Sequence, residues 1–316
     1  MKAALVTGAT TPLGAAIVSR LLADQRTARV LAVGAEPYEA VQALFPTSGV
    51  TYIQADLTRS RDLRNLLFHP AKEHEVKTVI HTAIHRLAHA TGSKIHHLNV
   101  ESTRELLRLS ERHPTIRSFV LRSHAEIYRV SAIEPEILDE RHAIDLSPQA
   151  PQWLRDRAEA DLLTCAAIGL SPLHVRILRC AECLAPDTGS QLFDYLRSEV
   201  CFQALGFDPM LNLISLGDLA RAFSLATAAS PSGVFNIVGK DTLPLSELIA
   251  KSGRMGVSVP GSLLAPMYWL RSKLIGTDFR YDLNRFRFHY SAVMDGSRAK
   301  AQLGYVPQES IIWPTP

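Results

Sequence analysis

The chain has 316 residues, of which 47% are hydrophobic and 21% charged, and its formal net charge is +3. This composition is ordinary for a globular protein, and so small a charge gives no reason to expect nucleic-acid binding. We expect no leader, because Met1-Lys2 runs directly into a strand pattern, and no membrane span, because no apolar run reaches roughly 18 residues. Four cysteines without framework spacing predict a reducing cytoplasm.

Strand-like and helical segments alternate through the first half of the chain. The sequence predicts strands at 3–6, 29–33, 50–54, 78–81, 118–121 and 173–178. Apolar residues at helical spacing follow the first strand and recur at about 62–69, 100–112 and 153–168. This alternation predicts an α/β fold with a doubly wound parallel sheet and helices on both faces. Pro and Gly cluster at 185–190, 230–233 and 257–261, which predicts loops leading into a smaller C-terminal lobe.

The first predicted strand ends in a glycine-containing turn, Thr7-Gly-Ala-Thr-Thr-Pro-Leu-Gly14, and a helix follows. Backbone N–H groups at such a strand-to-helix turn bind a pyrophosphate. Gly8 suits the tight turn, and Gly14 lets the helix pack closely on the strand. The alternative is a glycine-capped turn without a ligand. The order of strand, glycine turn and helix favours dinucleotide binding.

Beyond this turn, short motifs occur in a fixed order. Asp56-Leu57 follows the third predicted strand, His81-Thr-Ala-Ile84 ends the fourth, and Asn99-Val-Glu-Ser-Thr103 begins a helix. The fifth strand continues through Phe119-Val-Leu-Arg-Ser-His-Ala-Glu-Ile-Tyr128. Further short motifs follow in the same order at 175–178, 214–221, 235–239 and 303–307. Together they resemble the landmarks of the extended short-chain dehydrogenase/reductase superfamily, the NAD-dependent epimerases and dehydratases.

The resemblance implies a Rossmann dinucleotide-binding domain over residues 1–170, with later returns near 210–240, and mainly a substrate lobe over 171–316. It also implies NAD or NADP as cofactor and a small-molecule or nucleotide-linked ligand. The implied cofactor residues are Gly8, Thr10, Thr11, Pro12, Leu13, Gly14, Asp56, Leu57, Thr82, Ala83, Ile84, Asn99 and Arg157. Extended members often dimerise through the helices that would carry Thr103 and Glu159, so we expect a homodimer.

The cofactor type stays open on the sequence. The second strand of a Rossmann fold usually ends in an acid that binds the ribose 2′-OH of NAD. Here it ends in Gly34-Ala35, and Glu36 comes two residues late. No arginine stands there for the 2′-phosphate of NADP. Thr11 also departs from the family, since it replaces the middle glycine of the turn.

The departures that bear on chemistry lie at the catalytic positions. Trp153 and Arg157 stand where the family has its Tyr-x-x-x-Lys pair, and His124, preceded by Ser123, stands at the serine or threonine position. An indole N–H donates a hydrogen bond but does not titrate in water, and an arginine stays charged at working pH. The usual proton relay is therefore missing.

Two hypotheses follow. In the first, the protein is a catalytically degenerate member, a pseudoenzyme that binds a dinucleotide as a sensor, scaffold or partner protein. In the second, it is an atypical NAD(P)-dependent oxidoreductase or epimerase on a nucleotide-sugar or lipid-like substrate, with His124 or Tyr128 as acid–base group. The plainer interpretation of His124 is a polar loop histidine in a site that has lost its chemistry.

Three other patterns have structural interpretations. The histidines between His81 and His97 lack a metal-site signature, so we expect no metal, and Cys180 and Cys183 fit buried core positions. Apolar and then basic residues follow one another from Leu263 to Lys273, and aromatics and arginines interleave from Phe279 to Tyr290. This region fits a packed helix with a basic rim, a substrate lobe that holds a diphosphate, or peripheral contact with a membrane.

Overall fold

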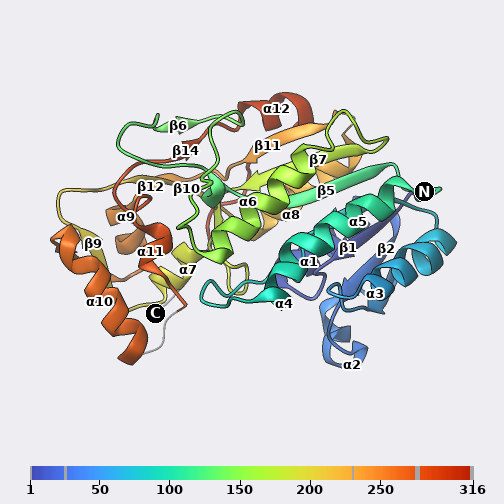
Figure 1. The fold of residues 1–316 in the computed structure, drawn as a ribbon, viewed down its shortest axis with the longest axis horizontal. Helices are drawn as coiled ribbons and strands as arrows, with labels where there is room; N and C mark the ends of the chain where they lie inside the picture. The colour runs from blue at the N-terminus through green and yellow to red at the C-terminus, as the bar shows by residue number, and fades with distance from the viewer. Residues whose placement is uncertain (1, 25–26, 230, 275–277, 314–316) are drawn as a thin grey trace.

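The computed structural model describes residues 2–24, 27–229, 231–274 and 278–313. Its centre is a seven-stranded sheet with the strand order β11-β7-β5-β4-β1-β2-β3, in which all neighbours are parallel. The strands are β1 (Lys2–Thr7), β2 (Thr27–Gly34), β3 (Val50–Gln54), β4 (Val76–His81), β5 (Ser118–His124), β7 (His174–Cys180) and β11 (Gly233–Ile237). Helices lie in front of and behind this sheet (Figure 1). The predicted fold class is confirmed.

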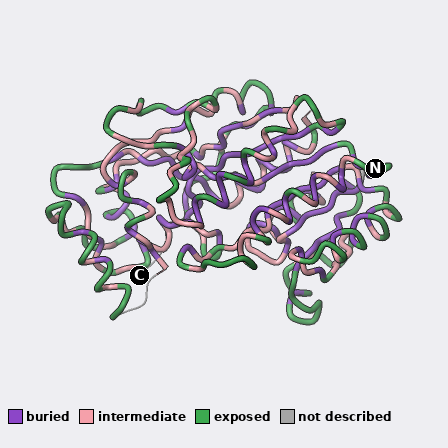
Figure 2. Tube along the Cα trace, in the orientation of Figure 1, coloured by how far each residue is buried: buried purple, intermediate pink, exposed green. Residues whose placement is uncertain are grey.

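Two apolar layers bury the two faces of the sheet. On one face, α1 (Pro12–Ala23), α8 (Leu216–Ala228) and α12 (Ser297–Leu303) pack against the strands. On the other, the main helices are α3 (Ser60–Leu66), α5 (Ser102–Glu111) and α6 (Gln152–Cys165). Strands covered on both faces are almost continuously apolar, which explains why the sequence identified them. Figure 2 shows the buried residues concentrated along these strands.

The predicted elements correspond closely to the observed ones. All six predicted strands are present, whereas β11 had been recognised only as a family landmark and not as a strand. The helix predicted at 62–69 is α3 followed by a π-helical turn, η2 (Leu67–Ala71), with Pro70 inside it. The helix predicted at 100–112 begins as a π-helical turn, η3 (His97–Glu101), that continues into α5.

The second lobe is built from short strands and helices around its own core. Its sheets have the orders β12-β10-β8, β13-β9 and β14-β6. The strands are β6 (Ile137–Leu138), β8 (Glu182–Cys183), β9 (Val200–Ala204), β10 (Met210–Ile214), β12 (Thr242–Pro244), β13 (Met255–Val259) and β14 (Val293–Met294). The helices are α7 (Gln191–Leu196), α9 (Leu245–Lys251), α10 (Gly261–Leu274) and α11 (Tyr281–Asn284). Short helices elsewhere are α2 (Tyr38–Val41), η1 (Gln42–Leu44), α4 (Ser93–His96) and η4 (Ala125–Ile127).

Two predicted loops are wrong in part. In the loop 230–233, Gly233 begins β11, and residue 230 lies outside the described residues. Residues 257–259, expected in the loop 257–261, belong to β13, which pairs in parallel with β9. Nearby glycines suggested a loop, but a strand partner far away in the sequence supplies the hydrogen bonds. Within the described residues, no helix is long and apolar enough to cross a bilayer.

Candidate functional site

The turn between β1 and α1 requires both of its glycines. Gly8 has φ +66°, and a Cβ there would lie 3.0 Å from the backbone of Ala83. A Cβ at Gly14 would lie 2.1 Å from the Gly8 carbonyl oxygen, so even alanine would displace the helix from the strand. Both positions therefore fit the roles assigned to them from the sequence.

Thr11 closes the turn with its own side chain. Its hydroxyl donates to the Gly8 carbonyl at 2.8 Å and accepts from the Gly14 N–H at 3.1 Å, which makes it the N-cap of α1. The Thr11 N–H also donates to Gly8, and Pro12 has no N–H. A helix start normally offers its first N–H groups to an anion, and here the Gly14 N–H is already bonded to Thr11.

The far end of the predicted dinucleotide site, away from the β1–α1 turn, lies beyond β2 and β3. Asp56 accepts hydrogen bonds from the Thr58 hydroxyl at 2.7 Å and the Thr58 N–H at 3.0 Å, and these bonds lower the pKa of its carboxyl. Glu36 comes two residues after the position of the usual acid, but its carboxylate lies near the end of β2. A Cβ on Gly34 would lie 3.1 Å from Glu36 Oε2. A carboxylate oxygen therefore lies close to the last residue of β2.

The predicted cofactor residues after β4 are largely engaged within the protein. The Thr82 hydroxyl donates to the Thr7 carbonyl at 2.7 Å. Asn99 accepts from the His85 N–H at 2.8 Å and donates to Asp156 at 3.3 Å. These contacts fasten the segment that contains Ala83 and Ile84 between β1 and α6, with the Ala83 backbone against Gly8.

Trp153 and Arg157 lie one turn apart on α6 and form a buried stack. The Arg157 guanidinium carbon lies 3.4 Å from the centroid of the Trp153 ring. Arg157 also donates to Glu126 Oε1 at 3.4 Å and to the Gly189 carbonyl at 3.5 Å. Burial lowers the pKa of Arg157 to about 9, although Glu126 opposes this shift. The two residues at the family's Tyr and Lys positions thus contact each other.

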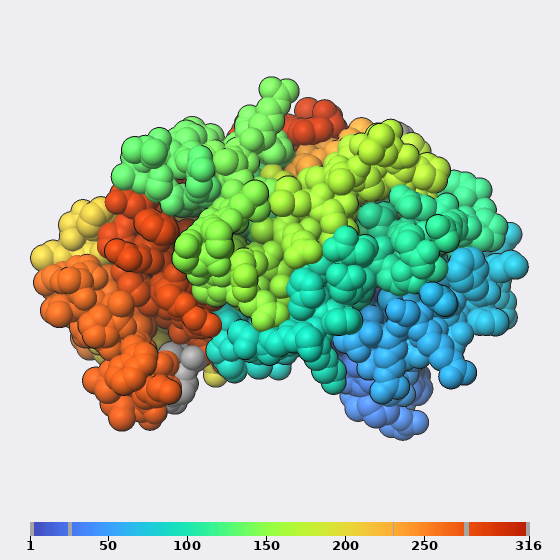
Figure 3. All heavy atoms as spheres, viewed as in Figure 1, coloured from blue at the N-terminus to red at the C-terminus, as the bar shows by residue number. Residues whose placement is uncertain are grey.

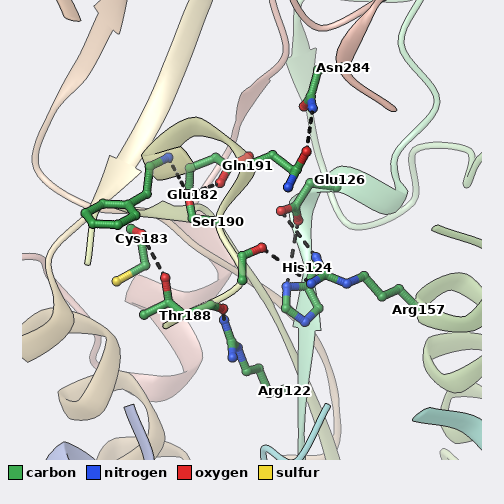
Figure 4. A network of polar contacts seen from close by, with 12 residues as sticks. Arg122, His124, Glu126, Arg157, Glu182, Cys183, Thr188, Ser190, Gln191 and Asn284 are labelled. Carbon is green, nitrogen blue, oxygen red and sulfur yellow. Dashed lines mark hydrogen bonds and ion pairs between the residues drawn. The ribbon is translucent and has the colours of Figure 1, made fainter. Parts of the chain in front are cut away.

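His124 lies at the end of β5, beside Glu126 (Figure 4). Its Nδ1 is 3.8 Å from Glu126 Oε2, while its Nε2 is buried and has no hydrogen-bond partner among the described residues. Burial, assisted by Arg157 and Arg122, holds the pKa of His124 well below the usual value, so the ring is neutral. A neutral buried ring can accept or donate one proton but carries no charge.

Glu126 belongs to a buried network that the sequence did not predict. Burial and the nearby Glu182 raise the pKa of Glu126, while Arg157 and Arg287 lower it. Glu182 accepts from Arg287 at 2.9 Å and from the Ser190 hydroxyl at 2.5 Å. Figure 4 shows Glu126, Glu182 and Ser190 on neighbouring segments around His124.

The sequence held a weak signal for this network. Glu126 occupies an unspecified position of the fifth-strand motif, and Glu182 lies between two cysteines that were expected in the core. Cys180 and Cys183 are indeed buried free thiols. An acid within an apolar, strand-like segment was the available clue, because such a charge is seldom buried without a partner.

Tyr128 is engaged elsewhere. Its hydroxyl donates to Asn236 Oδ1 at 2.6 Å and accepts from Arg179 Nη1 at 3.1 Å. Burial raises the pKa of Tyr128 to about 12. These contacts make Tyr128 a structural link between β5, β7 and β11 and a poor proton donor.

Several buried nitrogen atoms around this site have no hydrogen-bond partner among the described residues. They are Arg122 Nε, His124 Nε2, Trp153 Nε1 and Arg157 Nε. All but the imidazole nitrogen are obligatory donors. Buried donors normally find acceptors, so the chemistry of this set fits a ligand or water rich in acceptor oxygens.

The histidine stretch has local roles. His81 bridges the Thr7 and Thr103 hydroxyls at 2.7 and 2.9 Å, and its burial lowers its pKa to about 4. His96 contacts Asp156 at 2.9 Å. Among the described residues, no group of three or more His, Cys, Asp or Glu side chains is placed to hold a metal ion.

The central sheet is doubly wound, its first strand enters a glycine turn, and the second lobe lies beyond the carboxyl ends of its strands. This arrangement defines the Rossmann class of dinucleotide-binding folds. The family profile described as "NAD dependent epimerase/dehydratase family" matches residues 4–192. The chain belongs to this family.

Solved structures with this fold include DesIV, a dTDP-glucose 4,6-dehydratase from Streptomyces venezuelae with NAD and TYD bound. It has a TM-score of 0.71 and 21% identity, over 98% of this chain and 92% of that one. The UDP-glucuronic acid 4-epimerase from Bacillus cereus, in complex with UDP-glucuronic acid and NAD, has a TM-score of 0.70 and 18% identity, over 98% and 95%. An uncharacterized protein of Mycobacterium tuberculosis is 29% identical, over 97% of this chain and 80% of its own length.

Proposed function

We propose that the protein binds NAD along the β1–α1 turn and acts as a ligand-binding member of its family, without the family's usual proton relay. The observation that carries this proposal is the stack of Arg157 on Trp153 at 3.4 Å. Trp153 does not titrate in water, and Arg157 stays mostly protonated at neutral pH even with its pKa lowered to about 9. These two residues occupy the two positions of the relay.

The acidic end of β2 supports NAD over NADP. Glu36 Oε2 lies beside Gly34, where it can accept a hydrogen bond from a ribose 2′-OH. The same carboxylate would repel a 2′-phosphate. The similar dehydratase and epimerase structures also hold NAD.

The other end of the site supports a ligand with acceptor oxygens. The unpartnered nitrogens of Trp153, Arg157 and Arg122 are buried donors. Ribose hydroxyls and a carboxamide oxygen supply the acceptors that such donors lack, so a bound dinucleotide would relieve the cost of burying them.

A second candidate function, slow acid–base catalysis, is favoured by Glu126. Its pKa is raised by burial and by Glu182, and its Oε2 lies 3.8 Å from His124 Nδ1, while His124 Nε2 has no hydrogen-bond partner among the described residues. A carboxyl with a raised pKa is a better proton donor candidate than one with the usual pKa. In this alternative, Glu126 with His124 replaces the tyrosine of the family.

Calorimetric titration of the purified protein with NAD, NADH and NADP tests binding. We expect NAD to bind more tightly than NADP, and Glu36→Gln to reduce that preference by about tenfold, which corresponds to one hydrogen bond to a charged group. Absence of heat with all three dinucleotides at millimolar concentration would contradict the proposal.

Turnover is tested separately by incubation with NAD and nucleotide sugars. We expect rates far below the range of about 1–10³ per second that is usual for enzymes. Turnover in that range, lost in Glu126→Gln, would establish the second candidate in place of the first.

A further inference from the structure

The helix α10 presents apolar side chains to solvent. Of its fourteen residues, Leu264 and Tyr268 are buried against the lobe. The opposite side carries Leu263, Trp269 and Leu274, which are 49%, 63% and 74% exposed. A helix that is apolar on all sides normally lies in a core, a membrane or an interface. Within the described residues, the outer side of α10 therefore has no packing partner.

The outer residues follow helical spacing and form one face. We define the α10 outer face as Leu263, Pro266, Trp269, Leu270, Lys273 and Leu274. Positions 263, 266, 270 and 273 follow one another at intervals of three or four residues, and 274 is four residues after 270, so they lie on neighbouring turns of one side. At the start of the helix, the half-exposed Phe207 packs on His289, which lies beside Gly261 and extends the apolar area.

The charges of this helix have one sign. Within Gly261–Leu274 there is no Asp or Glu, and Arg271 and Lys273 lie in the last turn. Arg271 is turned inward, where it donates to the Val200 carbonyl at 2.6 Å, whereas Lys273 is exposed. Leu270 and Leu274 of this face also line a groove, together with Met267 and Arg271, that contains the acids Asp194, Glu199 and Asp278. The rest of the outer face, Leu263, Pro266, Trp269 and Lys273, is apolar and basic.

The shape of this surface distinguishes between partners. The helix runs along an outer edge of the second lobe (Figure 1), and its side chains form a projecting corner in orange (Figure 3). A partner protein would have to supply a groove for a projecting helix. A bilayer interface accepts one directly, with leucines among the acyl chains, Trp269 at the headgroups and Lys273 reaching the phosphates.

We propose that the α10 outer face docks the protein onto the surface of an anionic lipid bilayer. The helix lies in the plane of the interface, because fourteen residues span only about 21 Å, less than the roughly 30 Å of a hydrocarbon core. Apolar insertion supplies one part of the attraction and the basic last turn the other. One apolar helix with little charge gives weak, reversible binding.

Sedimentation with vesicles tests this proposal on the full chain. Vesicles of phosphatidylcholine mixed with phosphatidylglycerol should carry the protein into the pellet, and vesicles of phosphatidylcholine alone should carry much less. Tryptophan emission should shift to the blue, since Trp269 is exposed and Trp153 is already buried. The shift should disappear in Trp269→Phe.

Paired variants separate the two contributions. The double variant Leu263→Ser with Trp269→Ser should weaken binding at least about tenfold, and Lys273→Gln about fivefold on anionic vesicles only. Leu170→Ser is the control, because Leu170 is 86% exposed on the Rossmann domain, away from α10. All variants should keep the wild-type melting temperature.

Three results would overturn the proposal. In the first, wild-type protein stays in the supernatant with anionic vesicles. In the second, Leu170→Ser loses as much binding as the double variant. In the third, sedimentation without lipid shows a dimer that the double variant abolishes, which would assign the α10 outer face to a second copy of the chain.

Discussion

The guanidinium carbon of Arg157 lies 3.4 Å from the centroid of the Trp153 ring, and both side chains are almost fully buried. A cation against an aromatic face within a desolvated site is attracted by about 2 kcal/mol. The substitution at the tyrosine position therefore gives the buried arginine a partner. At these two positions the protein thus has a packing contact between an aromatic ring and a cation.

The first prediction concerns Trp153. Trp153→Ala should cost about 3–5 kcal/mol of unfolding free energy, because it leaves a cavity and exposes the buried arginine. Trp153→Phe should cost clearly less, since it keeps an aromatic face and removes an indole N–H that has no partner among the described residues. Chemical denaturation of both variants measures this. Equal losses would show that the indole N–H is satisfied, for example by water.

The second prediction concerns the glycine turn. In Gly14→Ala the new Cβ would lie 2.1 Å from the Gly8 carbonyl oxygen, so the start of α1 must move. We expect loss of NAD binding and a lower melting temperature. Gly169→Ala is the matched control: it has φ +79° but open space around it, so it should cost backbone strain only. The proposal fails if Gly14→Ala binds NAD as wild type does.

The sheet could be predicted from the sequence because its strands are apolar runs buried on both faces. The strands β6 and β14 could not, since each has two residues and its partner lies far away in the chain. The glycine turn and the Trp153/Arg157 positions were recognised from local motifs. The network of Glu126, Glu182 and Arg287 was missed, because segments distant in the sequence meet only in the folded chain.

The third prediction concerns the stability of the fold at acidic pH. His124 is buried with a pKa well below the usual 6.5, so the unfolded chain binds a proton that the folded chain rejects. Its contribution to stability is present above pH 6.5 and is lost as the pH falls below that value. The raised pKa of Asp194, about 7, has the opposite effect, so a comparison of variants is needed.

His124→Leu isolates this contribution. Relative to wild type, the variant should gain unfolding free energy as the pH falls from 7 to about 5. Urea denaturation at several pH values gives the difference directly. His81, with a pKa of about 4 and two hydrogen bonds, is present in both proteins, so its contribution to the unfolding free energy cancels in the difference. A constant difference across this range would mean that His124 has the same pKa in the folded and the unfolded chain.

The fourth prediction concerns assembly. We propose a homodimer through α5 and α6, as the family resemblance implies. On these helices, Arg104 pairs with Glu159 at 3.2 Å, and Leu162 is 40% exposed. Leu162→Asp should convert the dimer to a monomer in sedimentation velocity. Leu170→Asp, in the segment after α6, should leave the dimer intact. A wild-type monomer at all concentrations would exclude this assembly.

The last prediction concerns the buried pair of Arg157 and Glu126, which are 3.4 Å apart. In Arg157→Met, Glu126 loses its nearest cation, and removal of one member of a buried pair costs about 3–5 kcal/mol. The carboxyl can escape part of this cost by taking up a proton. Burial and Glu182 already raise the pKa of Glu126, and the loss of Arg157 should raise it further.

The sign of the pH dependence follows from that shift. A carboxyl whose pKa is raised in the fold is most favourable below its unfolded pKa of about 4.3, and its stability is lost as the pH rises through the folded value. Arg157→Met should therefore be more destabilising at pH 8 than at pH 5, and adding Glu126→Gln should recover most of the loss at the higher pH. A loss that is independent of pH, or no recovery in the double variant, would mean that Arg157 acts through its stack on Trp153 and not through Glu126.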